Sequence, residues 1–239
     1  MDSIKITMNL NQKLSPAPFV LASVLMSYPM DDNTENVRVL MEDADVDMPE
    51  ALKKMILAKT SAENIQDLQS EYIAIFDNGR EANPIYETEY DRRRAMAKGN
   101  ELSDIAGFYR AFGFELDSEA EGMEMLDHVG IELEFYSLML MKQLHLQEAK
   151  DEQGVEIVED GRKKFLQAHL GRFVGAISRR PGVVNSEFYS QVFNWGAELV
   201  DKECKDLNLE VVPADWVDSE QVKDEEMNCG ALNGGNCNK

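Results

Sequence analysis

Apolar residues recur at intervals of three and four positions along most of the chain, and the two-residue alternation of half-buried strands is scarce. Intervals of three and four place side chains on one face of an α-helix. The pattern therefore predicts an all-α fold: a single globular, bundle-like domain of about seven or eight helices.

The longest helical pattern runs from about Ser118 to Ala149. Its main stripe and the residues that widen it are Leu126, Val129, Leu133, Tyr136, Leu140 and Leu144, with Ile131, Phe135, Leu138 and Met139. A helix that is apolar around so much of its circumference is buried, so we expect this segment to be the central helix. Two more helices are expected over Glu156–Arg179 and Phe188–Leu207, the second after a cap at Asn185-Ser186.

Charge runs and breakers mark the domain boundary. After Pro213 the sequence turns acidic and then rich in Gly, Asn and Cys, a composition typical of segments without a packed core. We therefore predict an all-helical domain over residues 1–213 and a flexible acidic tail over residues 214–239.

The net charge of the chain is −21, from 45 acidic and 24 basic side chains. Phosphates would be repelled, so nucleic acid is not expected as a partner, whereas a basic peptide would be attracted. The simpler interpretation, that the acidic surface only keeps the protein soluble, stays open at this point.

The targeting signals and cysteines indicate a cytoplasmic protein. No basic region followed by an apolar one stands at the N-terminus, and the apolar stretch Phe19–Met26 is too short to cross a membrane. The three cysteines, Cys204, Cys229 and Cys237, form no C-x-x-C pair, which makes a disulfide framework or a zinc site improbable.

The common catalytic motifs are absent from the chain. It contains no phosphate-binding glycine loop, no nucleophile elbow and no H-E-x-x-H zinc motif. None of the three histidines, His128, His145 and His169, has a Glu three positions earlier, as a helical di-metal site requires. We therefore expect no catalysis, no metal and no cofactor; a helical enzyme built on acidic residues around His128 or His169 is the competing hypothesis.

The segment Asn83–Tyr90 is rich in aromatic residues and carries a proline. Pro84 prevents helix formation locally, so this loop must supply its own packing. Tyr86 and Tyr90 lie four positions apart, and Glu87 and Glu89 are expected to be solvated or paired with the basic run that follows. Taken alone, the segment is an aromatic-anchored helix connection.

The pair Asp127-His128 lies in the long apolar pattern, close to Glu132. Acidic neighbours favour protonated histidine, which could donate hydrogen bonds to a bound backbone. The residues alone favour the simpler interpretation, a capping or core histidine whose hydrogen bonds are satisfied within the protein.

Four segments together resemble the TorD/DmsD/NarJ family of cytoplasmic chaperones for molybdenum enzymes. They are Glu71–Phe76, Pro84–Tyr90, Asp127–Phe135 and Phe165–Leu170, and the resemblance covers about residues 65–175. The run Gln69–Tyr90 is most similar to the branch that serves nitrate-reductase-like enzymes of the type II dimethyl-sulfoxide-reductase group.

The resemblance implies a function and a site. It implies a system-specific chaperone that binds the N-terminal leader or tail of an apo molybdoenzyme catalytic subunit and holds it for cofactor insertion before export or assembly. The peptide-binding residues that it implies are Tyr72, Phe76, Tyr86, Glu87, Tyr90, Asp127, His128 and Glu132, which should converge on one groove. The protein would be a monomer or a homodimer. The alternative is a helical scaffold or sensor domain that binds another basic amphipathic partner.

Overall fold

The helical periodicity of the chain is realised as helices throughout the residues that the computed structural model describes: 14–30, 33–43, 46–90, 94–116 and 125–214. The elements are α1 (Ala17–Met26), α2 (Asn33–Met41), α3 (Glu50–Lys59), α4 (Ile65–Tyr72), the π-helical segment η1 (Ile73–Asp77), the 3₁₀ segment η2 (Glu87–Glu89), α5 (Arg94–Ala111), α6 (Val129–Glu148), α7 (Glu152–Ala168), α8 (Leu170–Ile177), α9 (Pro181–Asn185) and α10 (Glu187–Asp206). The predicted all-α fold class is confirmed. None of the described helices is both long and apolar enough to cross a membrane.

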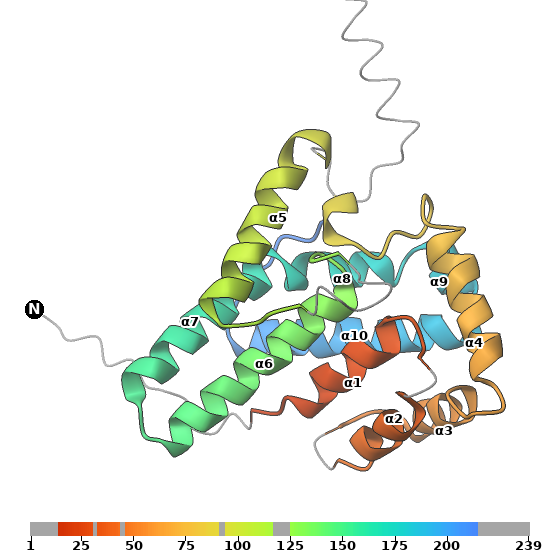
Figure 1. Ribbon diagram of the computed structural model, residues 1–239, viewed down its shortest axis with the longest axis horizontal. Helices are drawn as coiled ribbons and strands as arrows, with labels where there is room; N and C mark the ends of the chain where they lie inside the picture. Colours follow the sequence, from red (N-terminus) through yellow and green to blue (C-terminus); the bar gives the residue numbers. More distant parts are fainter. Residues whose placement is uncertain (1–13, 31–32, 44–45, 91–93, 117–124, 215–239) are drawn as a thin grey trace, which may run out of the picture.

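Helix α6 is the central helix, as its wide apolar surface predicted. It runs through the middle of the molecule with α1 packed along it and α7 and α8 against other faces (Figure 1). Val129, Leu133 and Phe135 have no exposed surface. The helix begins later than predicted, at Val129, and His128 caps it in an extended conformation; residues 117–124 lie outside the described part of the chain.

Gly130, on the first turn of α6, lies tightly against the C-terminal end of α1. A Cβ atom at this position would lie 2.1 Å from Ser27 Oγ and 3.1 Å from the Ser23 carbonyl oxygen. Ser27 is itself held, since its hydroxyl donates to the Ser23 carbonyl over 2.8 Å. The first turn of α6 can therefore approach α1 only where α6 has no side chain.

The single helix predicted over Glu156–Arg179 is wrong. The segment forms two helices, α7 and α8, separated at His169, whose backbone angles of −127° and −100° are not helical. His169 uses both ring nitrogens in contacts with other elements, and the change of direction aims its side chain at them. This break, together with the short helix α9, is one reason why the described residues contain ten α-helices rather than seven or eight.

The cap predicted before α10 is confirmed. The Ser186 hydroxyl accepts a hydrogen bond from the backbone N–H of Tyr189 over 2.8 Å, and it donates to Glu71 of α4 over 2.6 Å. Helix α10 then packs against α1 and α8, and its Phe188, Val192 and Phe193 belong to the core.

A buried arginine that sequence reasoning did not single out joins α6, α7 and α10. The Arg162 guanidinium of α7 donates to the Tyr136 hydroxyl over 3.1 Å and to Gln143 Oε1 over 2.5 Å, both on α6, and it forms an ion pair with Glu203 of α10. A buried charge is tolerated only when its donors find such partners. Sequence reasoning missed this arginine because no local pattern records that Glu203, 41 residues further along the chain, lies beside it.

After α10 the chain returns to α8. The Ala214 backbone N–H donates to the Arg172 carbonyl over 2.9 Å, and Ala214 is buried. Nearly all of the predicted tail, residues 215–239, lies outside the described part of the chain.

The close approach at Gly130 yields a stability prediction. Gly130→Ala should destabilise the protein by about 1–3 kcal/mol, because the added methyl group collides with α1. The matched control is Gly107→Ala on α5, where the added Cβ meets nothing within 4 Å. This control should stabilise the protein by about 0.5–1 kcal/mol, because alanine loses less backbone entropy in a helix. Urea unfolding followed by circular dichroism measures both, and equal effects of the two substitutions would contradict the packing.

Candidate functional site

Two segments about forty residues apart are joined by an antiparallel bridge between Tyr86 and His128. The Glu87 N–H donates to the Asp127 carbonyl over 2.8 Å, and the Val129 N–H donates to the Ile85 carbonyl over 3.1 Å. The loop that Pro84 keeps out of helical geometry thus finds its backbone partners in the residues that lead into α6.

The Asp127 side chain strengthens this junction. Its Oδ2 atom accepts hydrogen bonds from the Thr88 backbone N–H over 3.1 Å and from the Thr88 hydroxyl over 2.5 Å. Asp127 is fully buried, and its Oδ1 atom accepts no hydrogen bond from the described residues. Sequence reasoning missed Thr88; its place between two acidic residues gave no indication that it holds an aspartate.

His128 connects the bridge to α4. Its Nδ1 atom accepts the Gly130 N–H over 3.1 Å, and its Nε2 atom lies 3.2 Å from the Tyr72 hydroxyl. In the neutral ring, acceptance at Nδ1 leaves the proton on Nε2, which donates to Tyr72. The rings of His128 and Tyr86 meet edge to face with centroids 5.2 Å apart. His128 is thus the capping histidine of α6. It also links the bridge with Tyr86 to Tyr72 on α4.

The predicted aromatic residues extend this cluster. The rings of Tyr72 and Phe76 lie 4.9 Å apart, and Phe76 continues into the core against Tyr189 of α10. The Tyr90 hydroxyl donates to the Pro84 carbonyl over 2.7 Å and closes the loop on itself.

The third carboxylate of the site, Glu132, lies wholly inside the protein on the first turn of α6. No donor from the described residues reaches either of its oxygens. Burial, and then the negative charges of Glu87 and Asp127, raise the pKa of Glu132 well above its usual value. Burial among negative charges therefore favours the protonated form of the Glu132 carboxyl group.

His169, at the break between α7 and α8, lies beside the Glu87 carboxylate and forms a hydrogen-bonded pair with it. Its Nδ1 atom lies 3.0 Å from Glu87 Oε2, and its Nε2 atom lies 3.2 Å from Asp104 Oδ2 on α5. Burial alone lowers the pKa of His169, but the two carboxylates outweigh it and raise the pKa above the usual value. The expectation that Glu87 is solvated or paired with residues 92–94 is wrong, because Glu87 is buried against His169.

The eight predicted residues are therefore linked in one cluster, and all but one of them are buried. Tyr72, Phe76, Glu87, Tyr90, Asp127, His128 and Glu132 are at most 4% exposed, whereas Tyr86 is half-buried. The expectation that Asp127 and His128 line the surface of a groove is thus not met by their burial. Tyr86 is the member of the cluster that reaches the protein surface. The Arg80 guanidinium lies 4.4 Å from the centre of the Tyr86 ring and forms an ion pair with Glu89.

Comparison with known proteins adds one match. A family model described as the nitrate reductase delta subunit matches residues 38–179, which include all eight predicted site residues. No curated protein and no solved structure matches the chain. Within the described residues, no group of three or more His, Cys, Asp or Glu side chains is placed to hold a metal ion.

The burial of Glu132 predicts an unusual pH dependence. A carboxyl group whose pKa is raised by folding stabilises the folded state fully below its unfolded value of 4.5, and this contribution is lost as the pH rises toward the folded value. Glu132→Gln removes the cost of burying a titrating acid and supplies donors to its acidic neighbours. It should stabilise the protein at pH 8 by about 1–3 kcal/mol, with little effect near pH 4.5.

The control is Glu148→Gln at the exposed end of α6, which should change stability equally little at both pH values. Thermal and urea unfolding between pH 4.5 and 8 test the pair. A stability difference between wild type and Glu132→Gln that stays constant over this range would contradict a proton-holding carboxyl group at position 132.

Proposed function

The chain belongs to the nitrate reductase delta subunit family, whose members are chaperones of molybdoenzyme maturation and not enzymes, and from this premise we propose that it binds the N-terminal leader or tail of an apo catalytic subunit. The client is a nitrate-reductase-like molybdenum oxidoreductase. The chaperone holds this segment in the cytoplasm until the molybdenum cofactor is inserted, before export or assembly.

The bridge between Tyr86 and His128 is the observation that supports a peptide-binding site at this place in the fold. It gathers eight residues that the family resemblance singled out into one cluster, although they come from two regions of the chain. Burial divides their roles in the proposed site. Tyr86 contacts the peptide, while Asp127, His128 and Glu132 hold the loop that presents it.

The remaining residues of the proposed site are buried and support the loop without contacting the peptide. Tyr72 and Phe76 support His128 from α4 and η1, and Tyr90 and Glu87 hold the two ends of η2. A surface formed in this way is rigid before the peptide arrives, which lowers the entropy lost on binding.

The acidic charge of the protein supports a basic client segment. With a net charge of −21, the chaperone attracts a leader that carries arginine or lysine residues. Each exposed ion pair contributes only about 0–1 kcal/mol, so burial of apolar leader residues must supply most of the affinity. Charge therefore speeds association of the leader with the chaperone, and burial against the aromatic surface supplies most of the affinity.

The alternative of a scaffold or sensor domain for another basic amphipathic partner has no structural observation that favours it. The hypothesis of a helical enzyme around His128 or His169 fails on the family membership. Both histidines are also occupied by neighbouring side chains or backbone groups.

We predict that Tyr86→Ala weakens binding of the client leader about tenfold or more, because a central tyrosine is typical of the side chains that dominate interfaces. The probe is a synthetic peptide with the N-terminal sequence of the catalytic subunit that co-purifies with the chaperone. Isothermal titration calorimetry measures its affinity, and circular dichroism verifies that the variant is folded at the temperature used.

The matched control is Ile157→Ala, which removes an exposed apolar side chain from α7, away from the bridge. It should leave the affinity unchanged. Binding that survives Tyr86→Ala would move the site away from the bridge, and absence of any binding by the wild-type protein would refute the proposed function.

Association with the same peptide should slow steeply as salt is added, while dissociation changes little. Screening acts over about 8–10 Å at physiological ionic strength, so it weakens long-range attraction before it affects buried contacts. Stopped-flow fluorescence gives both rates. A control peptide with its basic residues replaced by glutamine should associate slowly at every salt concentration, and a salt-independent association of the basic peptide would remove the role of charge.

A further inference from the structure

The Arg80 side chain covers the ring of Tyr86, the member of the site cluster that reaches the surface. The guanidinium carbon lies 4.4 Å from the centre of the ring, and the Nε and Nη2 atoms donate to Glu89 Oε1 over 3.0 Å and 2.5 Å. Stacking on an aromatic ring and pairing with a carboxylate are the two interactions for which a planar guanidinium group is suited. Tyr86 and Glu89 thus hold a guanidinium group in the folded chain.

The backbone places Tyr86 and Glu89 next to each other. Tyr86 precedes the 3₁₀ segment η2, and the Glu89 N–H donates to the Tyr86 carbonyl over 3.2 Å. Side chains three positions apart in a 3₁₀ turn lie on the same side. Burial lowers the pKa of Arg80, but Glu89, and then Tyr86 and Asp127, raise it overall. The surroundings of the Tyr86 ring therefore favour a cation.

The Arg80 side chain can leave this position without disturbing the turn that carries it. The exposed fraction of the side chain is 42% for Arg80 and 22% for Glu89. The turn is held separately, because the Gly79 carbonyl accepts hydrogen bonds from the backbone and side-chain N–H groups of Asn83, each over 3.0 Å. Exposed ion pairs contribute little to stability. Another guanidinium group can therefore exchange with that of Arg80.

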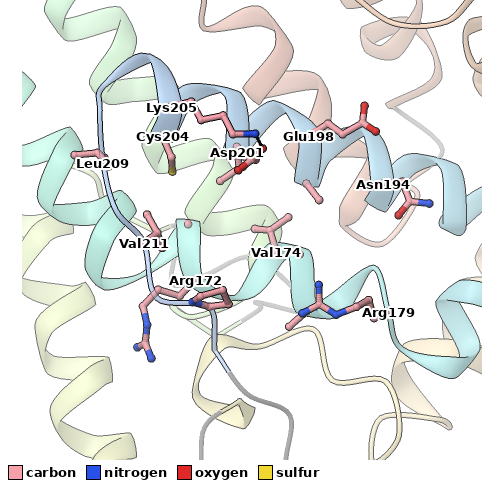
Figure 2. A pocket seen from close by; sticks show the side chains of 16 residues that line it. Arg172, Val174, Arg179, Asn194, Glu198, Asp201, Cys204, Lys205, Leu209 and Val211 are labelled. Carbon is pink, nitrogen blue, oxygen red and sulfur yellow. Dashed lines mark hydrogen bonds and ion pairs between the residues drawn. The ribbon is translucent and has the colours of Figure 1, made fainter.

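A groove between α8, α10 and the segment after α10 offers a second place for a basic segment (Figure 2). Its volume is about 520 Å³, and its charged lining residues are three basic and two acidic ones: Arg172, Arg179, Lys205, Glu198 and Asp201. Asp201 is already paired with Lys205. None of the described residues that line the groove is aromatic. The groove therefore offers neither an excess of negative charge nor a ring face, and the Tyr86 surface is the better match for an arginine.

We propose that Arg80 is an internal competitor for a guanidinium subsite, and that an arginine of the client leader displaces it from the Tyr86 ring and pairs with Glu89. This inference rests on the proposed chaperone function and names the side chain that the Tyr86 surface takes. One ring face holds one guanidinium group at this distance, so Arg80 must leave before the arginine of the leader can bind. A segment without arginine cannot replace both contacts of Arg80, which disfavours wrong partners.

Arg80→Ala should tighten binding of the leader peptide about three- to tenfold, because it removes a competing ion pair and a competing ring contact. The probes are the synthetic leader of the co-purifying catalytic subunit and versions in which each arginine in turn is replaced by citrulline, a neutral group of the same shape. One citrulline peptide should show no gain from Arg80→Ala. In the Arg80→Ala background, Glu89→Gln should reduce the difference in affinity between that peptide and the parent leader. Isothermal titration calorimetry measures all these affinities.

The matched control is Arg38→Ala on α2. Arg38 has a side chain that is 51% exposed and forms ion pairs with Glu35 and Glu42, so its removal makes the same change in net charge at another exposed ion pair. It should leave the affinity of every peptide unchanged. Circular dichroism verifies that each variant is folded. Arg80→Lys keeps the charge but loses the planar group, and it should give an affinity between those of wild type and Arg80→Ala.

A second measurement tests the subsite without the leader. N-acetyl-arginine amide is titrated at millimolar concentrations into protein with ¹³C-labelled tyrosine rings, and the Tyr86 signal is identified by its loss in Tyr86→Phe. The amide should shift this signal more in Arg80→Ala than in wild type, because the subsite is then vacant. N-acetyl-lysine amide should shift it less, since an ammonium group does not stack on the ring as a planar guanidinium does.

The two measurements separate failure of this inference from failure of the proposed function. Unchanged or weaker binding of the leader by Arg80→Ala, or an equal gain for every citrulline peptide, would overturn the inference and make Arg80 a fixed part of the surface. If no variant binds the leader while the Tyr86 signal responds to the arginine amide, the chaperone function fails and the guanidinium subsite stands. A Tyr86 signal in Arg80→Ala that ignores the amide would remove the subsite.

Discussion

The bridge between Tyr86 and His128 is the contact on which the candidate site depends. Pro84 prevents a helix in the loop, so the backbone groups of Ile85 and Glu87 need partners from elsewhere. They find them in Asp127 and Val129, just where α6 begins. The same contact therefore orders the loop, sets the start of the central helix and brings Tyr86 to the surface beside it.

The contact between the loop and the start of α6 contains buried acidic groups, which require particular neighbouring side chains. Asp127 accepts hydrogen bonds from Thr88, Glu87 lies against His169, and the raised pKa of Glu132 favours its neutral form. Each group is compatible with burial only in this arrangement, because an unpaired charge inside a protein is costly. At the other end of α6, Arg162 is neutralised by Glu203 and surrounded by acceptors. The interior thus specifies which helices meet through polar contacts as well as through apolar packing.

The separation of buried and exposed members suits a protein that binds rather than catalyses. The titratable groups Glu87, Asp127, His128 and Glu132 are buried, so the folded chain does not present them at its surface. Family membership assigns the chain to molybdoenzyme chaperones. The finer branch, which the run Gln69–Tyr90 suggested, stays a prediction.

The sequence by itself determined the fold class, the central position of α6 and the cap of α10, while the family resemblance named the candidate site residues. These features follow from local periodicity, capping chemistry and motif order, all of which are written in neighbouring positions. The tertiary structure alone decided that α6 begins at Val129, that His169 interrupts the predicted helix, and that Asp127 and Glu132 are buried. The physical reason is that a polar side chain is buried only when distant segments supply its partners, and no local pattern records where those segments lie.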